Sequence, residues 1–560
     1  MYIRTTQRKN KDGSVIRYVQ LAHNFRDEKT GQARAKVLYS FGREDQVDKD
    51  SLQRLVASIE KFLGPEEALR RMESAELKMK FEESRPLGGV WALEQLWAEL
   101  GIGKAVNRHL KDRAFQIPVE RAIFAMVANR ALAPMSKLAV EEWVAKDVPV
   151  TELESLQVHH LYRSLDALVE MEQELQKEVF FSVSDLLNLE VDLLFFDTTS
   201  TYFEIENEDL DEDEDGDYLL RRRGHSKDSR PDLAQVVIGL AVTREGIPVR
   251  VWTWPGNTAD VTRISQVKKD LIGWKLGRVI TVVDRGFMSE GNLKELQKTG
   301  GHYIVGEKMR SGKPEVEEAL ARAGRFQPVR PNVEVKEVIV GDGEARKRYV
   351  VVRNPQQKER DEKLREAMVK TLEAEIAGLK QLESGGHGKA VCRLMSHKTY
   401  GRYLKLKKDG LPRIDKAKLK AESRTDGKYL LLTSDDTLSV EDVALGYKQL
   451  LEVEDAFRTL KQTLELRPVY HRLSRRIRSH VNICWLALLL IRVAEVRAEQ
   501  ALGELITWDR MRTELDRMHL GRFSLDGGIL RQRTETTVQQ ARLLKAIGVE
   551  EPPPFFQITT

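Results

Sequence analysis

The sequence predicts an α/β protein built on a mixed β-sheet, and the pattern of residues 186–310 carries this prediction. The apolar segment VDLLFFD, at 191–197, is typical of a buried strand, and QVVIGLAVT and IPVRVWTW are joined by the turn residues REG as in a β-hairpin. A second buried strand, RVITVVD, ends at 284, and a helix and the strand HYIVGEK follow. We expect the first three strands to run antiparallel and the later ones to join the same sheet in parallel.

Two regions precede this core. Residues 1–47 contain strand-like segments separated by the turn signals KDG and KTG, which predicts a small β-rich region. Residues 48–185 carry apolar residues three and four positions apart, which predicts helices. Bases between Arg108 and Arg130 leave two interpretations open for this region: a helical domain that binds DNA, or a helix bundle whose bases are solvated.

Three regions follow the first part of the core. Residues 311–427 interrupt the alternation with strand-like segments and a long charged helical pattern, so we expect an insertion that contains β-structure. The core is expected to resume at 428–500, where one helix begins at about Ser439 and ends before Pro468, and an apolar helix comes next. We expect residues 501–560 to be helical and to end in a frayed terminus.

Composition limits the class of protein. A chain of 560 residues predicts several domains, and 41% apolar with 32% charged residues is typical of a globular protein. Cys392 and Cys484 can build neither a disulfide framework nor a cysteine zinc site, which fits a reducing cytoplasm. No secretory signal is visible, and the longest apolar run, 483–491, is too short to span a bilayer. We therefore expect a cytoplasmic protein without membrane contact.

A strongly acidic segment lies inside the predicted core. Residues 204–217 contain ten acids and no bases, and Arg221, Arg222 and Arg223 follow shortly after. Such a pattern is typical of a solvated, disordered loop between strands. The alternative is a segment that mimics DNA and competes for a basic surface.

Two aspartates stand at the ends of predicted buried strands. Asp197 ends LLFFD and Asp284 ends ITVVD, and each is followed by a polar or glycine-containing turn. A carboxylate there is costly unless the rim is wet or bears a partner. Adjacent strands would bring both acids to one edge of the sheet, where they could bind Mg²⁺, although a turn or helix cap also explains each one alone. Asp228, Asp232 and Asp260 lie in loop-like sequence and rank below them.

A third acid is predicted on the helix that follows Ser439. Tyr447, Glu454 and Lys461 lie seven residues apart, so they are expected to share one face of a continuous helix. The same face holds the apolar residues Leu450, Leu451, Phe457 and Leu464. We therefore expect Glu454 to point inward. The alternative to a catalytic role is an inward glutamate that pairs with Arg458 or Lys461 on its own helix.

These segments resemble the DDE transposases of bacterial insertion sequences, in the superfamily that includes the Tn-five and Tn-ten enzymes. The signature helix of that family has Tyr, two residues, Arg, three residues, Glu, six residues and Lys, and Tyr447, Glu454 and Lys461 fall on this spacing. Its Arg position is Leu450 here, and Lys448 or Arg458 could replace that phosphate contact. The blocks FDTTSTYFE, GHSKDSRPDLAQV, PGNTAD, VVDRGFMS and RPVYHR occur in this order between about 190 and 490.

The resemblance implies an RNase H-like core in which Asp197, Asp284 and Glu454 are the catalytic acids and bind two Mg²⁺ or Mn²⁺ ions. It also implies double-stranded DNA as the partner, both transposon ends and target, a homodimer in the synaptic complex and a nucleoid-associated location. The residues expected to contact DNA are Tyr447, Lys461, Arg458, Arg285, Lys227, Arg230, Arg475 and Arg476.

Local charge agrees with a DNA partner. Residues 401–430 contain ten Lys and Arg against four Asp and Glu, and residues 455–480 contain seven against two. Because DNA is held mainly through its phosphates, a basic surface is needed near the site. A solvated basic face is the alternative for both segments.

The sequence as a whole predicts a transposase that binds the terminal inverted repeats of its insertion sequence, cleaves the DNA ends and transfers the 3′-hydroxyl strands into target DNA. Two other functions are compatible with the same residues. One is an RNase H-fold nuclease without strand transfer, and the other is a non-catalytic, transposase-derived regulator that only binds DNA.

Overall fold

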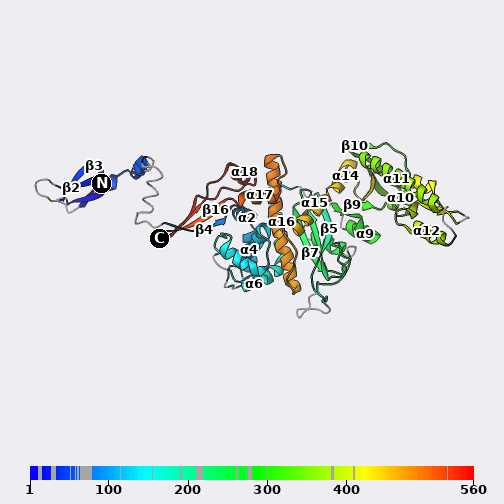
Figure 1. The fold of residues 1–560 in the computed structure, drawn as a ribbon, viewed down its shortest axis with the longest axis horizontal. Coiled ribbons are helices and arrows are strands. Elements are labelled where there is room, and N and C mark those ends of the chain that lie inside the picture. The colour runs from blue at the N-terminus through cyan, green and yellow to red at the C-terminus, as the bar shows by residue number, and fades with distance from the viewer. Residues whose placement is uncertain are drawn as a thin grey trace. The chain divides into compact units, whose positions relative to one another are not determined.

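A computed structural model describes residues 1–9, 15–26, 33–50, 52–56, 58–59, 62, 79–111, 113, 115, 117–153, 156–189, 192–209, 219–259, 263–272, 274, 280–298, 301–379, 384–407, 410–525 and 528–559 (Figure 1). The chain divides into two compact units. The first comprises Met1–Glu83, Arg522–Gln532 and Phe555–Thr560, and the second comprises Ser84–Gly521 and Arg533–Pro554.

The N-terminal sheet confirms the predicted small β region. Strands β1 (Tyr2–Lys9), β2 (Val15–Arg26) and β3 (Ala33–Arg43) form an antiparallel sheet in the order β1-β2-β3. The short helix η1 (Glu44–Gln46) follows. The predicted turn sequences KDG and KTG lie outside the described residues.

The C-terminal segment differs from the helical expectation. It contains α17 (Trp508–Leu515) and α18 (Val538–Ala546), but also β16 (His519–Leu525), β17 (Gly528–Arg533) and β18 (Phe555–Thr559). These strands form a four-stranded sheet with β4 (Lys80–Pro86), in the order β18-β17-β16-β4. The hairpin signal was present in the sequence, since the turn residues Asp, Gly and Gly separate HLGRFSL from ILRQR.

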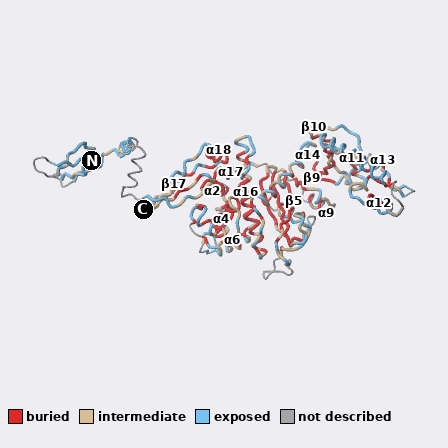
Figure 2. The backbone as a smooth tube through the Cα atoms, in the orientation of Figure 1, coloured by how far each residue is buried: buried red, intermediate tan, exposed pale blue. Residues whose placement is uncertain are grey.

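Within the described part of residues 88–187, six helices pack as a bundle. They are α2 (Gly88–Glu99), α3 (Ile102–Leu110), α4 (Val119–Leu132), α5 (Lys137–Lys146), α6 (Val158–Glu170) and α7 (Glu172–Leu187). Helix α4 is buried along nearly its whole length against α6 and the long helix α16 (Ser474–Leu502), as the red segments in Figure 2 show.

Three arginines of this bundle contact acids or carbonyl oxygens of the protein. Arg108 pairs with Glu178, Arg121 pairs with Glu120, and the buried Arg130 donates to the carbonyl oxygens of Met135 and of the segment after α15. Arg121 and Arg130 are therefore not the solvated bases of the second interpretation, whereas Arg108 is 67% exposed; both interpretations of this region stay predictions. Among the described residues no single helix is long and apolar enough to cross a membrane, and one bent pair, Val119–Leu132 with Lys137–Lys146, passes on length and composition only.

The central sheet has the predicted strand order and directions. Strands β5 (Leu193–Tyr202), β6 (Gln235–Val242) and β7 (Pro248–Pro255) run antiparallel. After α8 (Ile264–Ile272), β8 (Ile280–Val283) joins β5 in parallel, and after α9 (Glu290–Gln297), β9 (His302–Glu307) joins β8 in parallel. The order β7-β6-β5-β8-β9, with this mixture of directions, is that of an RNase H-like core.

The strands of the insertion continue the same sheet instead of forming a separate one. The complete order is β10-β11-β12-β15-β9-β8-β5-β6-β7, and β15 pairs antiparallel with β9. The strands of the insertion are β10 (Gln327–Arg330), β11 (Val333–Val340) and β12 (Lys347–Arg353), and β15 (Lys428–Thr433), the first strand after the insertion, joins them to β9. The edge of β9 is thereby paired, which removes an exposed row of backbone donors and acceptors.

The rest of the insertion has a small apolar core of its own. Helix α10 (Pro314–Ala321) packs on β11 and β12. The other elements are α11 (Pro355–Leu379), α12 (Ser384–Ser396), η6 (Gly401–Tyr403), β13 (Leu404–Leu406), β14 (Pro412–Ile414) and α13 (Lys416–Ser423). Buried Leu372, Leu394 and Leu404 hold three of these elements together.

Helices lie on both faces of the central sheet. On one face, Leu296 of α9 shares an apolar core with Phe196 of β5. On the other, Gly446 of α14 (Val440–Lys448) lies so close to Leu193 that an added Cβ would be 3.0 Å from its Cδ1. Because side chains alternate along a strand, Leu193 and Phe196 point to opposite faces. Helix α14 therefore lies on the face opposite α9, together with α15 (Leu451–Arg458), which packs on β5 and β6.

Candidate active site

Asp197 and Asp284 lie side by side on neighbouring parallel strands. The ladder between β5 and β8 places Phe196 opposite Val283, and the two aspartates are the next residue on each strand. Neighbouring strands lie about 4.8 Å apart. Phe196 and Val283 point into the core on the α8 and α9 side, so alternation turns both aspartates to the face of α14 and α15. The structure thus brings these two predicted acids side by side. Only Asp284 follows a strand end, however: β5 continues to Tyr202, so the predicted strand end at Asp197 was wrong.

Asp284 accepts a hydrogen bond from Tyr447, the first residue of the predicted signature motif. The hydroxyl of Tyr447, at the end of α14, donates to Asp284 Oδ1 at 3.0 Å. Burial raises the pKa of Tyr447, and the neighbouring carboxylate raises it further, so the phenol stays protonated and keeps donating. The tyrosine ring fits against β9 because residue 306 is glycine: a Cβ there would lie 2.4 Å from the hydroxyl oxygen.

Asp197 has a basic neighbour. Lys227 Nζ lies 3.7 Å from Asp197 Oδ1, and it donates to the carbonyl oxygen and hydroxyl of Thr198 at 2.6 and 2.7 Å. The backbone N–H of Thr198 also donates to Asp197 Oδ1, at 2.7 Å. The side chain of Asp197 remains 23% exposed, so a ligand can still reach this carboxylate.

Glu454 does not point inward, so that prediction was wrong. Its side chain is exposed, whereas Val453, Ala456 and Phe457 are buried. The predicted continuous helix is broken: α14 ends at Lys448, α15 spans Leu451–Arg458, and a π-helical turn covers Thr459–Thr463. A seven-residue spacing therefore does not keep one face here.

The predicted partners of Glu454 have other contacts. Arg458 pairs with Asp455, and Lys461 donates to Asp228 at 2.8 Å. The interpretation of Glu454 as an inward glutamate paired on its own helix is therefore not supported. Glu454 is an exposed carboxylate on a helix that packs against the strand carrying Asp197.

The acids fit divalent ions in chemistry, and two of the three fit in position. Mg²⁺ and Mn²⁺ prefer carboxylate oxygens, and Asp197 and Asp284 supply them from adjacent strands. Within the part of the chain that the structure describes, no three His, Cys, Asp or Glu side chains are close enough to hold a metal ion. Glu454 is thus on the correct face of the sheet but does not complete a cluster with the two aspartates.

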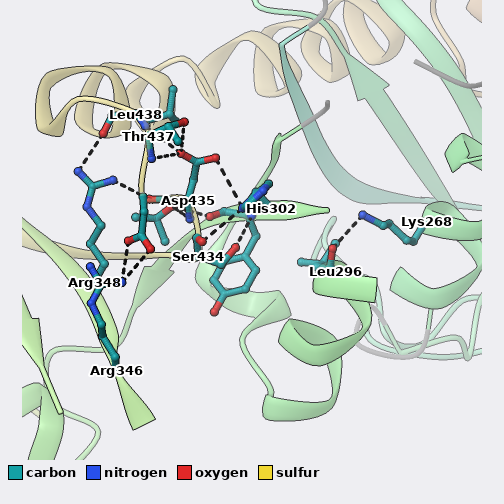
Figure 3. A network of polar contacts seen from close by, with 12 residues as sticks. Lys268, Leu296, His302, Arg346, Arg348, Ser434, Asp435, Thr437 and Leu438 are labelled. Atoms are coloured by element: carbon teal, nitrogen blue, oxygen red, sulfur yellow. Dashed lines mark hydrogen bonds and ion pairs between the residues drawn. The ribbon is translucent and has the colours of Figure 1, made fainter. Parts of the chain in front are cut away.

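The turn into α14 is fixed by a buried acid, as Figure 3 shows. Asp435 is fully buried, and its Oδ1 accepts from the backbone N–H groups of Thr437 and Leu438, each at 2.8 Å. Arg348 of β12 donates to the carbonyl oxygens of Asp435 and Leu438 at 2.6 and 2.9 Å, and His302 of β9 lies 3.6 Å from Asp435 Oδ2. These contacts fix the start of α14, and therefore the position of Tyr447, relative to β9.

Of the other predicted DNA contacts, Arg285 lies beside this site and the remaining arginines pair with acids of the protein. Arg475 and Arg476 both pair with Asp166 of α6, which occupies their charge inside the protein. Arg285 follows Asp284 and is exposed. Arg230 is partly exposed and pairs with Asp232 at 2.8 Å. Asp260 lies outside the described residues.

Sequence reasoning missed one acid and one base. Asp228 ranked low because its surroundings look like a loop, yet it binds Lys461 and also lies 3.4 Å from Arg467. Arg467 opens the RPVYHR block, which was noted without a role for this residue. Both residues could have been singled out from the sequence, because each lies in a block that resembles a family motif: Asp228 in GHSKDSRPDLAQV and Arg467 in RPVYHR.

The acidic segment is described only at its start. Arg221 forms a two-bond contact with Asp209, at 2.6 and 3.0 Å. The backbone N–H of Arg223 donates to Glu208 at 2.8 Å. The arginines that follow the segment therefore bind its first acids, while residues 210–217 lie outside the described residues.

Comparisons with known proteins match two parts of the chain. The N-terminal domain of IS1634 family transposases matches residues 3–69, and the transposase DDE domain matches residues 221–490, which include Asp284 and Glu454 but begin after Asp197. No curated protein matches. A solved structure, the cryo-EM structure of a piggyBac transposase synaptic complex with hairpin DNA, is similar at 10% identity over 76% of this chain and 79% of that chain. Its TM-score of 0.36 is too low to carry an argument.

Proposed function

We propose that this chain is a DDE-type transposase of the insertion-sequence kind, which binds the terminal inverted repeats of its element, cleaves the DNA ends and joins their 3′-hydroxyl strands to target DNA. The matches of residues 3–69 and 221–490 to two transposase domains support this proposal. The observation that carries the proposal is the adjacent position of Asp197, within β5, and Asp284, directly after β8, on neighbouring parallel strands of an RNase H-like sheet. The narrower likeness to the Tn-five enzymes remains a prediction.

The three acids have one shared role in this proposal. Asp197, Asp284 and Glu454 would hold two Mg²⁺ or Mn²⁺ ions, which activate the attacking water or 3′-hydroxyl and relieve the charge on the scissile phosphate. The aspartates are already adjacent on rigid strands, whereas Glu454 lies on a short helix between two breaks. We infer that a shift of α15 on DNA binding brings Glu454 to the aspartates.

The neighbours of the acids orient them. Tyr447 keeps one oxygen of Asp284 in place through its hydroxyl, so the other oxygen remains available as a ligand. Lys227 lowers the repulsion between Asp197 and the second carboxylate. Lys461 would contact a DNA phosphate beside the cut, and two copies of the chain would pair the two ends in a synaptic complex.

The test is an in vitro reaction with the full chain, a supercoiled donor plasmid that carries the element ends, and Mg²⁺. We expect cleavage and strand joining for the wild type and loss of both for Asp197→Ala and Glu454→Gln. Glu441→Gln is the matched control, because Glu441 is an exposed acid on α14, at the end of the helix away from Tyr447. Unchanged cleavage by Asp197→Ala would contradict the site.

The same reaction separates the two alternatives. Cleavage without strand joining by the wild type would indicate an RNase H-fold nuclease. Specific binding to the ends without any cleavage, in Mg²⁺ and in Mn²⁺, would indicate a regulator that has kept only the DNA-binding function.

A further inference from the structure

Two bases from different segments converge on one carboxylate next to the candidate active site. Lys461 Nζ donates to Asp228 Oδ1 at 2.8 Å, and Arg467 Nη1 lies 3.4 Å from Asp228 Oδ2. The side chain of Asp228 is 14% exposed, and Oδ2 is buried without a hydrogen bond. The Asp228 carboxylate therefore lies between two cations, and of the two only Lys461 forms a hydrogen bond with it.

The loop that carries Asp228 is attached to the catalytic strand. The backbone N–H of Lys227 donates to Ser200 Oγ of β5 at 2.9 Å. Within the loop, Ser226 Oγ accepts from the backbone N–H groups of Asp228 and Arg230, at 3.2 and 3.0 Å. Consecutive residues of one loop thus face two parts of the site: Lys227 faces Asp197, and Asp228 faces Lys461.

Arg467 is held in place independently of Asp228. Its guanidinium lies over the ring of Tyr202, 4.5 Å from the centroid, at the end of β5. Arg230 lies 5.4 Å from the same centroid, but its charge is paired with Asp232. Arg467 is therefore the cation over this ring that lies next to the carboxylate bound by Lys461. A guanidinium in a fixed position is well suited to bind phosphate.

We propose that Lys461 and Arg467 form a binding site for a backbone phosphate of DNA, and that Asp228 occupies the place of that phosphate while DNA is absent. The inference rests on the proposed function. The two non-bridging oxygens of a backbone phosphate can accept from both cations at once. Two anions cannot share this position, so DNA has to displace Asp228, and the carboxylate lowers the affinity of the resting chain for DNA.

The test measures DNA affinity without any cleavage. Binding of a fluorescent duplex of arbitrary sequence to the full chain is titrated in EDTA at several salt concentrations, because backbone contacts need no specific sequence. We expect Asp228→Asn, which keeps the shape and removes the charge, to bind roughly tenfold tighter than the wild type. Arg467→Ala should bind more weakly and should lower the slope of log K against log salt by about 0.9.

Two further variants make the result specific. In the double variant Asp228→Asn with Arg467→Ala, the gain from the first substitution should shrink, because one of the two cations that it frees is gone. Lys545→Ala removes an exposed base on α18, far along the chain from this site, and should change the slope less than Arg467→Ala does. Thermal unfolding of each variant checks that the fold is kept.

Weaker binding by a folded Asp228→Asn protein would overturn the inference, since it would show that Asp228 only positions Lys461. An unchanged slope for Arg467→Ala would overturn it as well. Both results would leave the proposed function standing if the wild type cleaves and joins DNA. Failure of the wild type to cut its ends would instead contradict the proposed function, whatever the binding data show.

Discussion

The hydroxyl of Tyr447 donates to the carboxylate of Asp284 across 3.0 Å, and this bond joins the signature segment to the sheet that carries the aspartates. It connects residues 163 positions apart in the sequence. The helix α14 and the strand end of β8 therefore have to keep their relative positions for the site to exist.

The first prediction concerns this bond. Tyr447→Phe should leave the fold intact, because the ring still fits, but should lower the rate of DNA cleavage roughly tenfold or more by releasing Asp284. Gly306→Ala should have the same effect by another route, since its Cβ would lie 2.4 Å from the tyrosine oxygen. Cleavage rates and melting temperatures are measured for both variants, and wild-type rates in both would contradict the assigned role.

The second prediction concerns the turn that precedes α14. Asp435→Ala should lower the free energy of unfolding by about 3 kcal/mol, because it removes a fully buried acceptor from the N–H groups of Thr437 and Leu438 and from the buried network around it. The matched control is the next residue. Asp436 is 57% exposed and pairs with Arg346, so Asp436→Ala should change stability by less than about 1 kcal/mol. Chemical denaturation measures both, and equal effects would argue against the buried network.

The third prediction concerns pH. Burial, together with the charges of Lys137, Arg476 and Arg130, lowers the pKa of His471 to about 3, while Asp166 partly opposes this shift. The unfolded chain binds the proton near the ordinary value of 6.5, so the protein loses stability as the pH falls from 6.5 towards 3.

The measurement compares the wild type with His471→Phe, which can keep the edge contact with Tyr162. The melting temperature of the wild type should fall more between pH 7 and pH 4 than that of the variant, because only the wild type has this histidine. Parallel pH profiles would show that another group causes the acid sensitivity.

The strands of the core could be predicted because they are short, apolar and bounded by turns. LLFFD and ITVVD predicted two neighbouring parallel strands and the adjacent position of their aspartates. The end of β5 was not predicted, because the polar residues after Asp197 continue the strand to Tyr202 by pairing with β6. The continuation of the sheet into the insertion could not be predicted, because the pairing of β15 with β9 joins segments more than a hundred residues apart.

The orientation of Glu454 was mispredicted for a physical reason. Spacing fixes a face only in an unbroken α-helix, and here a turn at 449–450 precedes α15 and a π-helical turn at Thr459–Thr463 follows it. The partnership of Asp228 with Lys461 was equally hidden, since it depends on how a loop of irregular backbone folds against β5.

The most direct test of the central claim is the position of Mn²⁺ in a DNA-bound structure, located by anomalous scattering. We expect manganese ions coordinated by Asp197 and Asp284, with a carboxylate oxygen of Glu454 at a bonding distance of about 2.2 Å from at least one of the ions. Manganese ligated by other acids, with Glu454 roughly 10 Å or more away from both aspartates in the assembled complex, would contradict it.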